Sequence, residues 1–536
     1  MRNIAISMNA PRRLLIALAL AGLSACGGGG GGGGSSSGGN GGGGSNGWIA
    51  GVFQPSSSFA AQCAAPRTGS DPGTGMRYPD VQGSTLAENN WLRSWTNELY
   101  LWYREVRDQN PALFATPDYF DSLKTFATTS SGHPKDKFHF TYATAEWQAL
   151  SESGMQAGYG AQWAIIAETP PRLILVAYTE PNAPATTAPA NLARGAQVLV
   201  IDGVDVVNAT GNVNIDTMNA GLFPSAAGET HAFSILDPGA TTPRTVTMVS
   251  ANLPSAPVQN VATMTTASGT VGYMLFNDHL ATAEAALITA VNTLRAAGIN
   301  DLVLDIRYNG GGFLDIASEA AYMIAGPGPT AGRTFEQVQF NDKHPFTDPV
   351  TGNPLTPIPF YRTAGGYGSV PAGQALPTLN LSRVYVLTGP DTCSASESII
   401  NSLRGVNVEV IQVGSTTCGK PYGFYPRDNC GTTYFSIEFR GVNAMGFGDY
   451  TDGFSPANAS GATGVPVPGC AVADDFTHGL GDPAEALLAT ALSYRTNSIC
   501  PGPPTGIARS KRMDALSGTG GILHKSPWLQ NRIFRR

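Results

Sequence analysis

The sequence predicts an α/β fold preceded by a smaller β domain and a helical N-terminal domain. Residues 256–497 alternate apolar strands with helices, which is the pattern of α/β proteins. Residues 155–252 contain short β runs separated by Pro, Gly and Thr, whereas residues 84–150 carry apolar side chains at helical intervals. With 536 residues, 42% of them apolar, the chain is long enough for two or three domains that each have a core.

The strands and helices of the α/β region can be placed individually. Strands are expected at residues 270–276, 302–306, 384–388 and 408–413. Helices are expected at residues 281–297, 314–325 and 396–404. Each strand returns the chain to the same end of the sheet, so the segments that follow the strands are expected to lie close together.

An aromatic stripe predicts the N-terminal domain. Thr85 and Glu88 have the spacing of a capping box, which marks the start of a helix. Apolar residues then recur at helical intervals at Trp91, Leu92, Trp95, Leu99, Trp102, Tyr103 and Val106. At this spacing such residues form a core far more often than a ligand platform, so a small helical cap is expected.

The first 26 residues resemble a bacterial lipoprotein signal. Arg12 and Arg13 precede a short apolar run at 14–23, and the segment Leu-Ser-Ala-Cys ends at Cys26. The resemblance implies that Cys26 is lipidated, and Gly27 after it favours the outer membrane. An ordinary cleaved signal peptide with an incidental cysteine is the alternative. Residues 27–47 are almost entirely Gly and Ser, which predicts a flexible tether.

The charge of the chain argues against one class of partner. The net charge of −7 and the scattered basic residues make nucleic acid an unlikely partner.

The cysteine content favours disulfides. An even number of cysteines remains after Cys26, as expected of disulfides in an exported chain: Cys63, Cys393, Cys418, Cys430, Cys470 and Cys500. The sequence leaves the pairing open, although Cys418 with Cys430 is favoured because the two lie close together across an expected hairpin. Neither a Cys-x-x-Cys motif nor a His pair supports a metal site.

Two polar residues follow neighbouring strands of the α/β region. Ser394 lies where the strand 384–388 gives way to a helix, whose N-terminal N–H groups and dipole can stabilise a developing negative charge. An N-cap serine is the structural alternative. Lys420 follows the strand 408–413. It can activate a hydroxyl only if its surroundings lower its pKa from about 10.4, and a solvated surface lysine is the alternative.

A glycine loop follows the strand 302–306. Asn309 precedes three glycines, which permit positive φ and close backbone approach, as an oxyanion site requires. No Lys-Ser or Lys-Thr follows, which argues against a phosphate loop. His279 is a second possible base, but an isolated histidine is usually structural. Cys393 is interpreted as paired or buried and not as a thiol nucleophile.

Three motifs occur in a fixed order along the chain: the glycine loop, the Ser-Ala-Ser-Glu segment at 394–397 and the Gly-Lys pair at 419–420. In this order they resemble the motifs of the carboxyl-terminal processing (tail-specific) serine proteases. The resemblance covers about residues 155–497 and implies a ClpP/crotonase-like protease core. It implies that Ser394 is the nucleophile and that Lys420 is its base. It also implies an oxyanion site with supporting residues, namely Gly311, Gly312, Ala395, Glu397 and Thr417.

One position departs from the family pattern. Members often carry a glutamine four residues after the lysine, where this sequence has Phe424. Either a simpler Ser/Lys dyad operates or another polar group, such as Thr417, holds the amine. The expectation is a serine endopeptidase that cleaves extended or C-terminal protein segments through an acyl-enzyme and needs no cofactor. A non-catalytic PDZ-type peptide-binding scaffold is the first alternative, and an esterase or other acyl transferase is the second.

Residues 155–255 resemble a PDZ domain. Their Gly-containing loop has the place of the PDZ loop that caps the terminal carboxylate of a peptide, at Gly158, Tyr159, Gly160 and Ala161. Such a module binds an extended peptide as an added strand. Tyr159 and Ala161 stand where apolar residues usually flank this loop, and a β domain without ligand is the alternative.

The sequence thus predicts six segments and a location in the cell envelope. They are a lipoprotein signal peptide at 1–26, a Gly/Ser linker at 27–47, a helical domain at 48–154, a PDZ-like domain at 155–255, a serine protease domain at 256–500 and a basic, disordered tail at 501–536. The chain is expected to face the periplasm as an outer-membrane lipoprotein, held at the membrane by its lipid alone.

Overall fold

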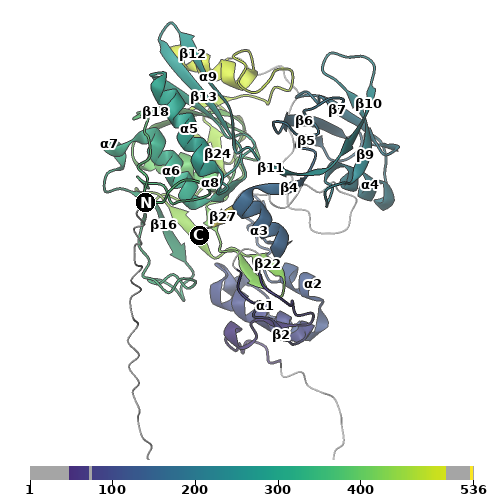
Figure 1. Ribbon diagram of the computed structural model, residues 1–536. Coiled ribbons are helices and arrows are strands. Elements are labelled where there is room, and N and C mark those ends of the chain that lie inside the picture. The colour runs from purple at the N-terminus through teal and green to yellow at the C-terminus, as the bar shows by residue number, and fades with distance from the viewer. Residues whose placement is uncertain (1–47, 72–74, 502–531, 535–536) are drawn as a thin grey trace, which may run out of the picture. The chain divides into compact units, whose positions relative to one another are not determined.

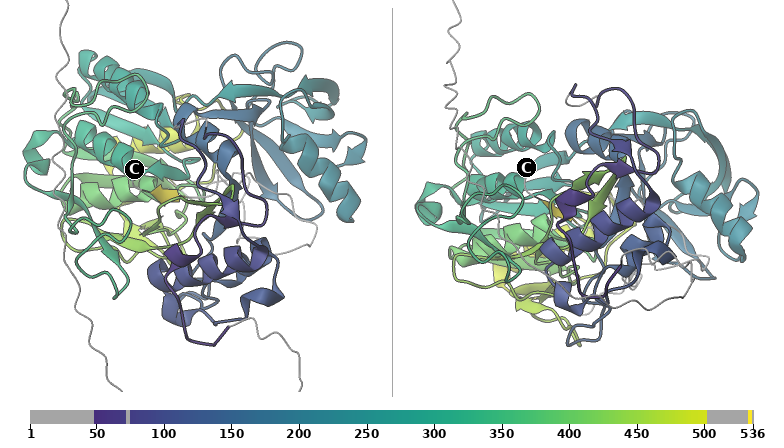
Figure 2. Two further views of the ribbon diagram at one scale, coloured as in Figure 1. Left: turned by 60° about the horizontal axis from the view of Figure 1, so that its bottom comes forward. Right: turned by 90° about the horizontal axis from the view of Figure 1, so that it is seen from below.

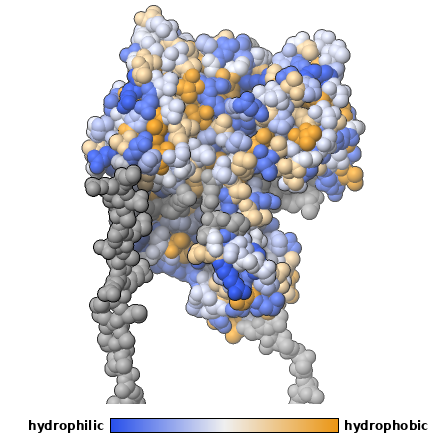
Figure 3. All heavy atoms as spheres, viewed as in Figure 1, coloured by the Kyte–Doolittle hydropathy of each residue, from blue (hydrophilic) through white to orange (hydrophobic). Residues whose placement is uncertain are grey.

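The computed structural model describes residues 48–71, 75–501 and 532–534 (Figure 1). The predicted signal with Cys26, the predicted linker and most of the predicted tail lie outside these residues. Within the described residues, no helix is long and apolar enough to cross a membrane. Hydrophilic and hydrophobic residues are interspersed over the face of the molecule seen in Figure 3.

A six-stranded sheet forms the centre of the α/β region. Its strands, in spatial order, are β12 (Val258–Thr266), β13 (Gly269–Phe276), β14 (Asp301–Asp305), β18 (Arg383–Thr388), β19 (Glu409–Gly414) and β26 (Gly469–Ala471). The first pair is antiparallel and every later pair is parallel. The four strands predicted from the sequence are confirmed within one or two residues at each end, and the parallel pairing brings the C-terminal ends of β14, β18 and β19 to one edge.

Helices cover both faces of this sheet. They are α5 (Ala283–Ala296), α6 (Leu314–Ala325), α8 (Ala395–Gly405) and α9 (Ala486–Asn497). Side chains of α5, α6 and α8 share one apolar cluster with Leu302 and Leu304 of β14, whereas Val303 packs with Leu488 of α9 on the other face. This alternation along β14 gives a layer of three helices on one face and α9 on the opposite face.

The β domain is an antiparallel sheet that is inserted between two paired strands. The inserted sheet has the order β10 (Arg244–Val249), β9 (Thr230–Leu236), β7 (Gln197–Ile201), β6 (Leu173–Thr179) and β5 (Ala161–Ala167), with β8 (Val204–Asp205) beside β7. Its core includes side chains of α4 (Asn212–Leu222). The chain enters through β4 (Met155–Gly158) and leaves through β11 (Ala251–Pro254), which pair antiparallel.

The N-terminal region is not purely helical. It contains α1 (Thr85–Leu99), α2 (Thr116–Ser122), α3 (Thr144–Ser153) and the strands β1 (Gln62–Cys63), β2 (Val81–Gln82) and β3 (Phe140–Ala143). The predicted capping position is wrong by one residue: Ser84 is the N-cap of α1 and its side chain accepts a hydrogen bond from the N–H of Ala87.

Strand β3 joins the N-terminal region to the α/β region. It completes a three-stranded sheet with β21 (Arg427–Asn429) and β22 (Thr432–Phe435). The indole of Trp91 on α1 packs against the ring of Tyr434 on β22, with 5.5 Å between ring centroids. Figure 2 shows α1 in purple beside these green strands.

The remaining strands form smaller sheets outside the central one. A four-stranded sheet has the order β17 (Ile358–Pro359), β16 (Thr334–Phe340), β23 (Phe439–Val442) and β20 (Tyr422–Gly423). The short elements are α7 (Pro327–Thr330), β24 (Phe454–Pro456) and β25 (Val465–Val467). In addition, β15 (Gly311–Phe313) pairs in parallel with β27 (Arg532–Phe534), so these three residues of the tail form a strand.

Three disulfides link distant parts of the chain. They join Cys63 to Cys430, Cys393 to Cys418 and Cys470 to Cys500. The favoured pair of Cys418 with Cys430 is therefore wrong. Cys430 lies in the turn between β21 and β22, where the N-terminal region also binds, whereas Cys418 lies on the loop after β19.

Candidate active site

Ser394 lies at the start of α8, directly after the loop that follows β18. It is fully buried, and its backbone φ of +61° and ψ of −116° are unusual for a residue with a side chain. Such a conformation costs about 1–3 kcal/mol and persists only where the surrounding structure enforces it. Within the described residues, the Ser394 hydroxyl has no hydrogen-bond partner. Ser394 is also the N-cap residue of α8, with Glu397 at the N3 position of a capping box, so the structural role expected as the alternative is present as well.

The carboxylate of Glu397 joins the serine segment to the lysine segment. Its Oε2 accepts hydrogen bonds from the N–H of Ser394 at 3.0 Å and from the N–H of Lys420 at 2.7 Å. Its Oε1 accepts from the N–H of Gly419 at 2.8 Å and from the hydroxyl of Thr417. Burial raises the pKa of Glu397, although these donors oppose the rise. One buried side chain therefore holds both segments together.

Lys420 is fully buried between aromatic rings. Its Nζ lies 4.7 Å from the ring centroid of Phe138 and 4.3 Å from that of Phe424. The position that often carries glutamine in the family thus presents an aromatic face to the amine. Phe138 comes from the N-terminal region, just before β3, so that region contributes to the surroundings of the amine.

The glycine loop is tied to the serine segment through Asn309. The backbone carbonyl of Asn309 accepts from the N–H of Cys393 and from the hydroxyl of Ser396, both at 3.0 Å. Its side-chain Oδ1 accepts from the N–H of Gly311 at 2.9 Å. The loop is thereby fixed against the first turn of α8.

Gly312 can only be a glycine in this position. Its φ is +137°, and a Cβ atom added there would lie 2.7 Å from the backbone oxygen of His279. Ala395 follows Ser394 directly as the first residue of α8. The structure thus brings the predicted residues Ser394, Ala395, Glu397, Thr417 and Lys420 into one buried cluster, with the glycine loop attached to it.

His279 lies on the opposite side of the glycine loop. Its Nδ1 is 3.0 Å from Oδ1 of Asn309, and its backbone N–H donates to the carbonyl of Gly311. The ring is fully buried, and burial lowers its pKa to about 3. These contacts support the glycine loop and agree with a structural role for His279.

The C-terminal strand lies beside the glycine loop. Gly312 is the Cα partner of Ile533 in the parallel pairing of β15 with β27. On its other side, Gly312 forms a parallel bridge with His279. The glycine loop is therefore sandwiched between the segment after β13 and the end of the chain.

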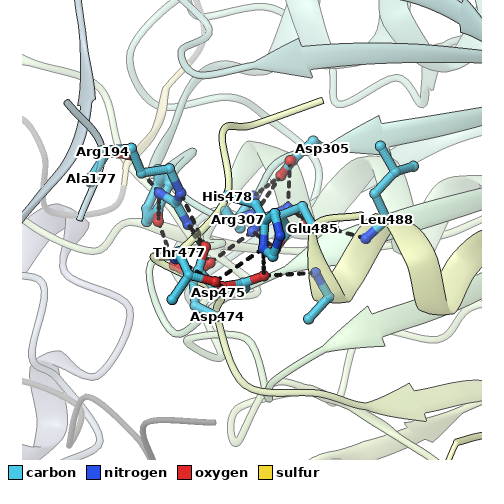
Figure 4. Close-up of polar contacts among 12 residues, drawn as sticks. Ala177, Arg194, Asp305, Arg307, Asp474, Asp475, Thr477, His478, Glu485 and Leu488 are labelled. Atoms are coloured by element: carbon cyan, nitrogen blue, oxygen red, sulfur yellow. Dashed lines mark hydrogen bonds and ion pairs between the residues drawn. The ribbon is translucent and has the colours of Figure 1, made fainter. Parts of the chain in front are cut away.

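A buried ionic network connects the β domain to the segment before the glycine loop (Figure 4). The Arg194 guanidinium donates to Oδ1 of Asp474 at 2.6 Å and to the hydroxyl of Tyr308 at 2.7 Å. Arg307 donates to the same Asp474 oxygen at 2.7 Å and to Glu485 at 2.8 Å. Burial alone would raise the pKa of Asp474, but the two guanidinium groups hold it below its usual value.

The predicted peptide-binding loop lies at the entrance of the β domain, between β4 and β5. Gly158 ends β4, Ala161 begins β5, and the ring of Tyr159 is buried against Phe233. The carbonyl of Tyr159 accepts from the N–H of Ala185, and the carbonyl of Gly160 accepts from the N–H of Glu180. Two of the loop's carbonyls are thus paired with the turn after β6.

Two clusters of Cys and Glu side chains have the proximity expected of metal ligands, namely Cys63 with Glu88 and Cys430, and Cys393 with Glu397 and Cys418. In both clusters the two cysteines are joined by a disulfide, so neither sulfur is available as a thiolate. Neither cluster fits a metal ion in this state.

Sequence reasoning missed three features of the site. The sequence predicts a glycine loop after Asn309 but not that Asn309 itself fixes the loop, although an Asn before Gly-Gly-Gly could suggest such a role. The contribution of Phe138 could not be foreseen, because it depends on the pairing of β3 with β22. The disulfide of Cys393 with Cys418 was also missed, although each cysteine lies within two residues of a predicted catalytic side chain.

The cluster of a helix-terminal serine, a buried lysine and a glycine loop lies within a segment that matches a known family. Residues 270–424 match peptidase family S41. This S41 segment contains every residue of the cluster. The chain is also 27% identical over 277 residues to a carboxyl-terminal-processing protease of Picosynechococcus sp., covering 51% of this chain and 56% of that relative's length. These two matches support a serine peptidase of the carboxyl-terminal-processing type.

A solved structure supports the fold around the S41 segment. A protein of Bacteroides fragilis assigned to the S41 proteases superimposes with a TM-score of 0.57 and 24% sequence identity, covering 79% of this chain and 98% of that one. The likeness extends the S41 protease fold, with its mixed α/β content, over most of the chain.

Proposed function

We propose that this chain is a serine endopeptidase that cleaves extended or C-terminal protein segments with a Ser394/Lys420 dyad. The Ser394 hydroxyl attacks the carbonyl carbon of the scissile bond while its proton passes to the neutral amine of Lys420. The lysine then gives that proton to the departing amine, and water hydrolyses the acyl-enzyme by the same path. Backbone N–H groups near Gly312 and Ala395 stabilise the oxyanion.

The shared Glu397 carboxylate is the observation that carries this proposal. Hydrogen bonds from the N–H groups of Ser394 and Lys420 to one oxygen keep the two backbones adjacent. The positive φ of Ser394 adds support, because enforced strain of this kind gathers at functional sites. The side chains of Ser394 and Lys420 are both fully buried, which agrees with a shared interior site.

We further propose that the β domain acts as a PDZ-like module that captures an extended peptide and delivers it to Ser394. Its antiparallel sheet is the kind of platform to which a peptide adds as a strand. The three disulfides agree with export into an oxidising compartment, as a lipoprotein of the cell envelope would require.

The test uses unstructured peptides and three proteins: wild type, Ser394→Ala and Lys420→Met. Wild type is expected to cleave the peptides. Each variant is expected to lose about 10³-fold or more in kcat/KM, because a site that still binds the peptide but lacks the nucleophile or the base accelerates cleavage very little. A trapped acyl-enzyme on Ser394, seen by mass spectrometry, identifies the nucleophile. Cleavage that survives Ser394→Ala would contradict the dyad, and no cleavage by wild type would leave the peptide-binding scaffold as the function.

A further inference from the structure

One disulfide connects the two halves of the proposed dyad. Cys393 is the residue directly before Ser394, and Cys418 lies two residues before Lys420. Their Cα atoms are 5.2 Å apart, and both side chains are buried. The covalent link therefore crosses between the start of α8 and the loop after β19 at the point where the proposed chemistry takes place.

Irregular backbone surrounds both ends of this link. Residues 415–421 form no helix or strand, so the backbone of Lys420 has no ladder of hydrogen bonds to hold it. Gly419 within this loop has φ of +81°. Ser394 itself has a positive φ, which the preceding and following residues must enforce. Each dyad residue thus depends on contacts outside regular secondary structure for its position.

Hydrogen bonds also join the two segments at this junction. The N–H of Cys418 donates to the carbonyl of Thr392 at 3.0 Å, and the Glu397 carboxylate accepts from both segments. These bonds form only if the loop is already seated against α8. A covalent link between neighbouring residues of the two segments limits how far they can separate when such bonds open.

We propose that Cys393 and Cys418 are positioning residues whose disulfide holds the Ser394 hydroxyl and the Lys420 amine in register for proton transfer. The proposal rests on the proposed serine peptidase function. It assigns the disulfide a role in catalysis in addition to stability, because a displacement of about 1 Å at a reacting pair can lower the rate 100-fold.

The chain offers a matched control. The Cys470–Cys500 disulfide spans 30 residues and the Cys393–Cys418 disulfide spans 25, so the two constrain the unfolded chain to a similar extent. Cys470 lies on β26 at the far end of the central sheet from β12, and Cys500 follows α9. Neither residue belongs to the proposed catalytic cluster.

The experiment compares Cys393→Ala/Cys418→Ala with Cys470→Ala/Cys500→Ala in the otherwise complete chain. Both double variants are expected to unfold at lower denaturant concentration than wild type. Only the first is expected to lose tenfold or more in kcat with KM changed less than threefold, while the second keeps kcat within twofold of wild type. Equal kcat values for the two double variants would overturn the proposal.

Two further measurements test the proposal if no peptide is cleaved or if the first double variant does not fold. Hydrogen exchange at the N–H groups of Ser394 and Lys420 is expected to accelerate in the first double variant and not in the second, whether or not peptides are cleaved. If the first variant does not fold, wild type is reduced stepwise with a dithiol, and the opened disulfides are identified by alkylation and mass spectrometry. Loss of activity should follow opening of Cys393–Cys418. The proposal would be overturned if wild type keeps full activity with the Cys393–Cys418 disulfide open, or if hydrogen exchange at Ser394 and Lys420 is the same in the first double variant as in wild type. If wild type cleaves no peptide but exchange is faster in the first double variant, only the proposed peptidase function is refuted.

Discussion

Glu397 accepts more hydrogen bonds in the site than its place in the Ser-Ala-Ser-Glu segment suggests. Four donors converge on its carboxylate, three of them backbone N–H groups that move with Ser394, Gly419 and Lys420. A buried donor that loses its acceptor costs about 1–3 kcal/mol. The side chain therefore contributes both to the stability of the fold and to the alignment of the proposed dyad.

Glu397→Gln is expected to impair both properties. The amide keeps one acceptor oxygen but presents an NH₂ group to backbone donors, so the free energy of unfolding should fall by about 2–4 kcal/mol. The kcat/KM for peptides should fall about 100-fold, because the backbones of Ser394 and Lys420 lose their common anchor. Urea denaturation and steady-state kinetics measure the two effects.

Glu438→Gln provides the control for this substitution. Glu438 is also fully buried, but its carboxylate accepts only the N–H of Tyr425, at 3.0 Å, among the hydrogen bonds seen in the described residues. This variant should keep kcat/KM within a few-fold of wild type. If both variants lose activity equally, the shared anchor at Glu397 is not what aligns the dyad.

The sequence predicts the proximity of those site residues that come directly after a strand. Ser394 and Lys420 come after β18 and β19, which are adjacent parallel strands, and alternating strands and helices in the sequence are enough to expect that they meet. The resemblance to a protease family then identified Ser394 as the expected nucleophile. The partner of Cys63 could not be inferred, because Cys430 lies 367 residues away and no local pattern connects them.

Strand β27 is the element with the most direct bearing on access to the site. It pairs with the glycine loop strand β15, where a peptide running past the proposed nucleophile would also lie. A segment of the same chain has an effective concentration in the millimolar range. We therefore expect the C-terminal strand to compete with an extended peptide for the edge of β15.

Removal of residues 502–536 is expected to raise kcat/KM for short peptides about tenfold, mainly through a lower KM. Ile533→Pro is the matched variant of full length, because proline removes an N–H from the strand without shortening the chain. It should also raise kcat/KM. Steady-state kinetics at several peptide concentrations measure both, and unchanged KM in the two proteins would contradict competition by β27.

Among the elements, those with a local signal were predicted well and those made by distant pairing were not. The helix α6 was placed at its observed bounds, because its apolar residues and the glycine before it mark both ends. The predicted N-cap of α1 is Thr85 but the observed one is Ser84, since both residues can cap and only the fold selects one. Strand β3 was missed because its partner β22 lies about 290 residues later.

The ionic network around Asp474 is one of the places where the β domain contacts the α/β region. Arg194 before β7 and Arg307 after β14 share one carboxylate oxygen, and Tyr308 lies directly before Asn309 of the glycine loop. Removal of one guanidinium leaves a partly buried carboxylate and a phenol with fewer partners.

Arg194→Ala is expected to lower the free energy of unfolding by about 2 kcal/mol, because Arg307 still pairs with Asp474 and limits the loss. Hydrogen exchange at residues 308–312 should accelerate as Tyr308 loses a donor. Arg244→Ala is the control, since its ion pair with Asp237 is about one-third exposed and should contribute less than 1 kcal/mol. Equal losses in the two variants would contradict a joining role for Arg194.

The buried carboxyl group of Glu438 makes the stability of the folded molecule depend on pH between about 4 and 8. Burial raises the pKa of Glu438 to about 8, whereas an unfolded glutamate titrates near pH 4.3. The folded protein therefore binds one more proton than the unfolded chain between these values, and the stability that this proton contributes is present below about pH 4 and is lost as the pH rises through 8.

Glu438→Gln should make the stability less dependent on pH. The amide stays neutral, so the decline of the free energy of unfolding between pH 5 and pH 8 should become shallower by up to about 1.4 kcal/mol per pH unit. Urea denaturation at one-unit intervals of pH measures the slope. A slope identical to that of wild type would show that Glu438 is already ionised in the folded protein.

The pairing of strands β4 and β11 would allow the β domain to be removed from the chain. Gly158 lies opposite Ala251 in their antiparallel register, so the two points where the inserted sheet leaves and rejoins the chain are neighbours. A two-residue Asn-Gly turn can close such a pair, which allows excision of residues 159–250 without stretching the remaining backbone. A shortened enzyme of this kind would reveal how much of substrate choice belongs to the catalytic centre by itself.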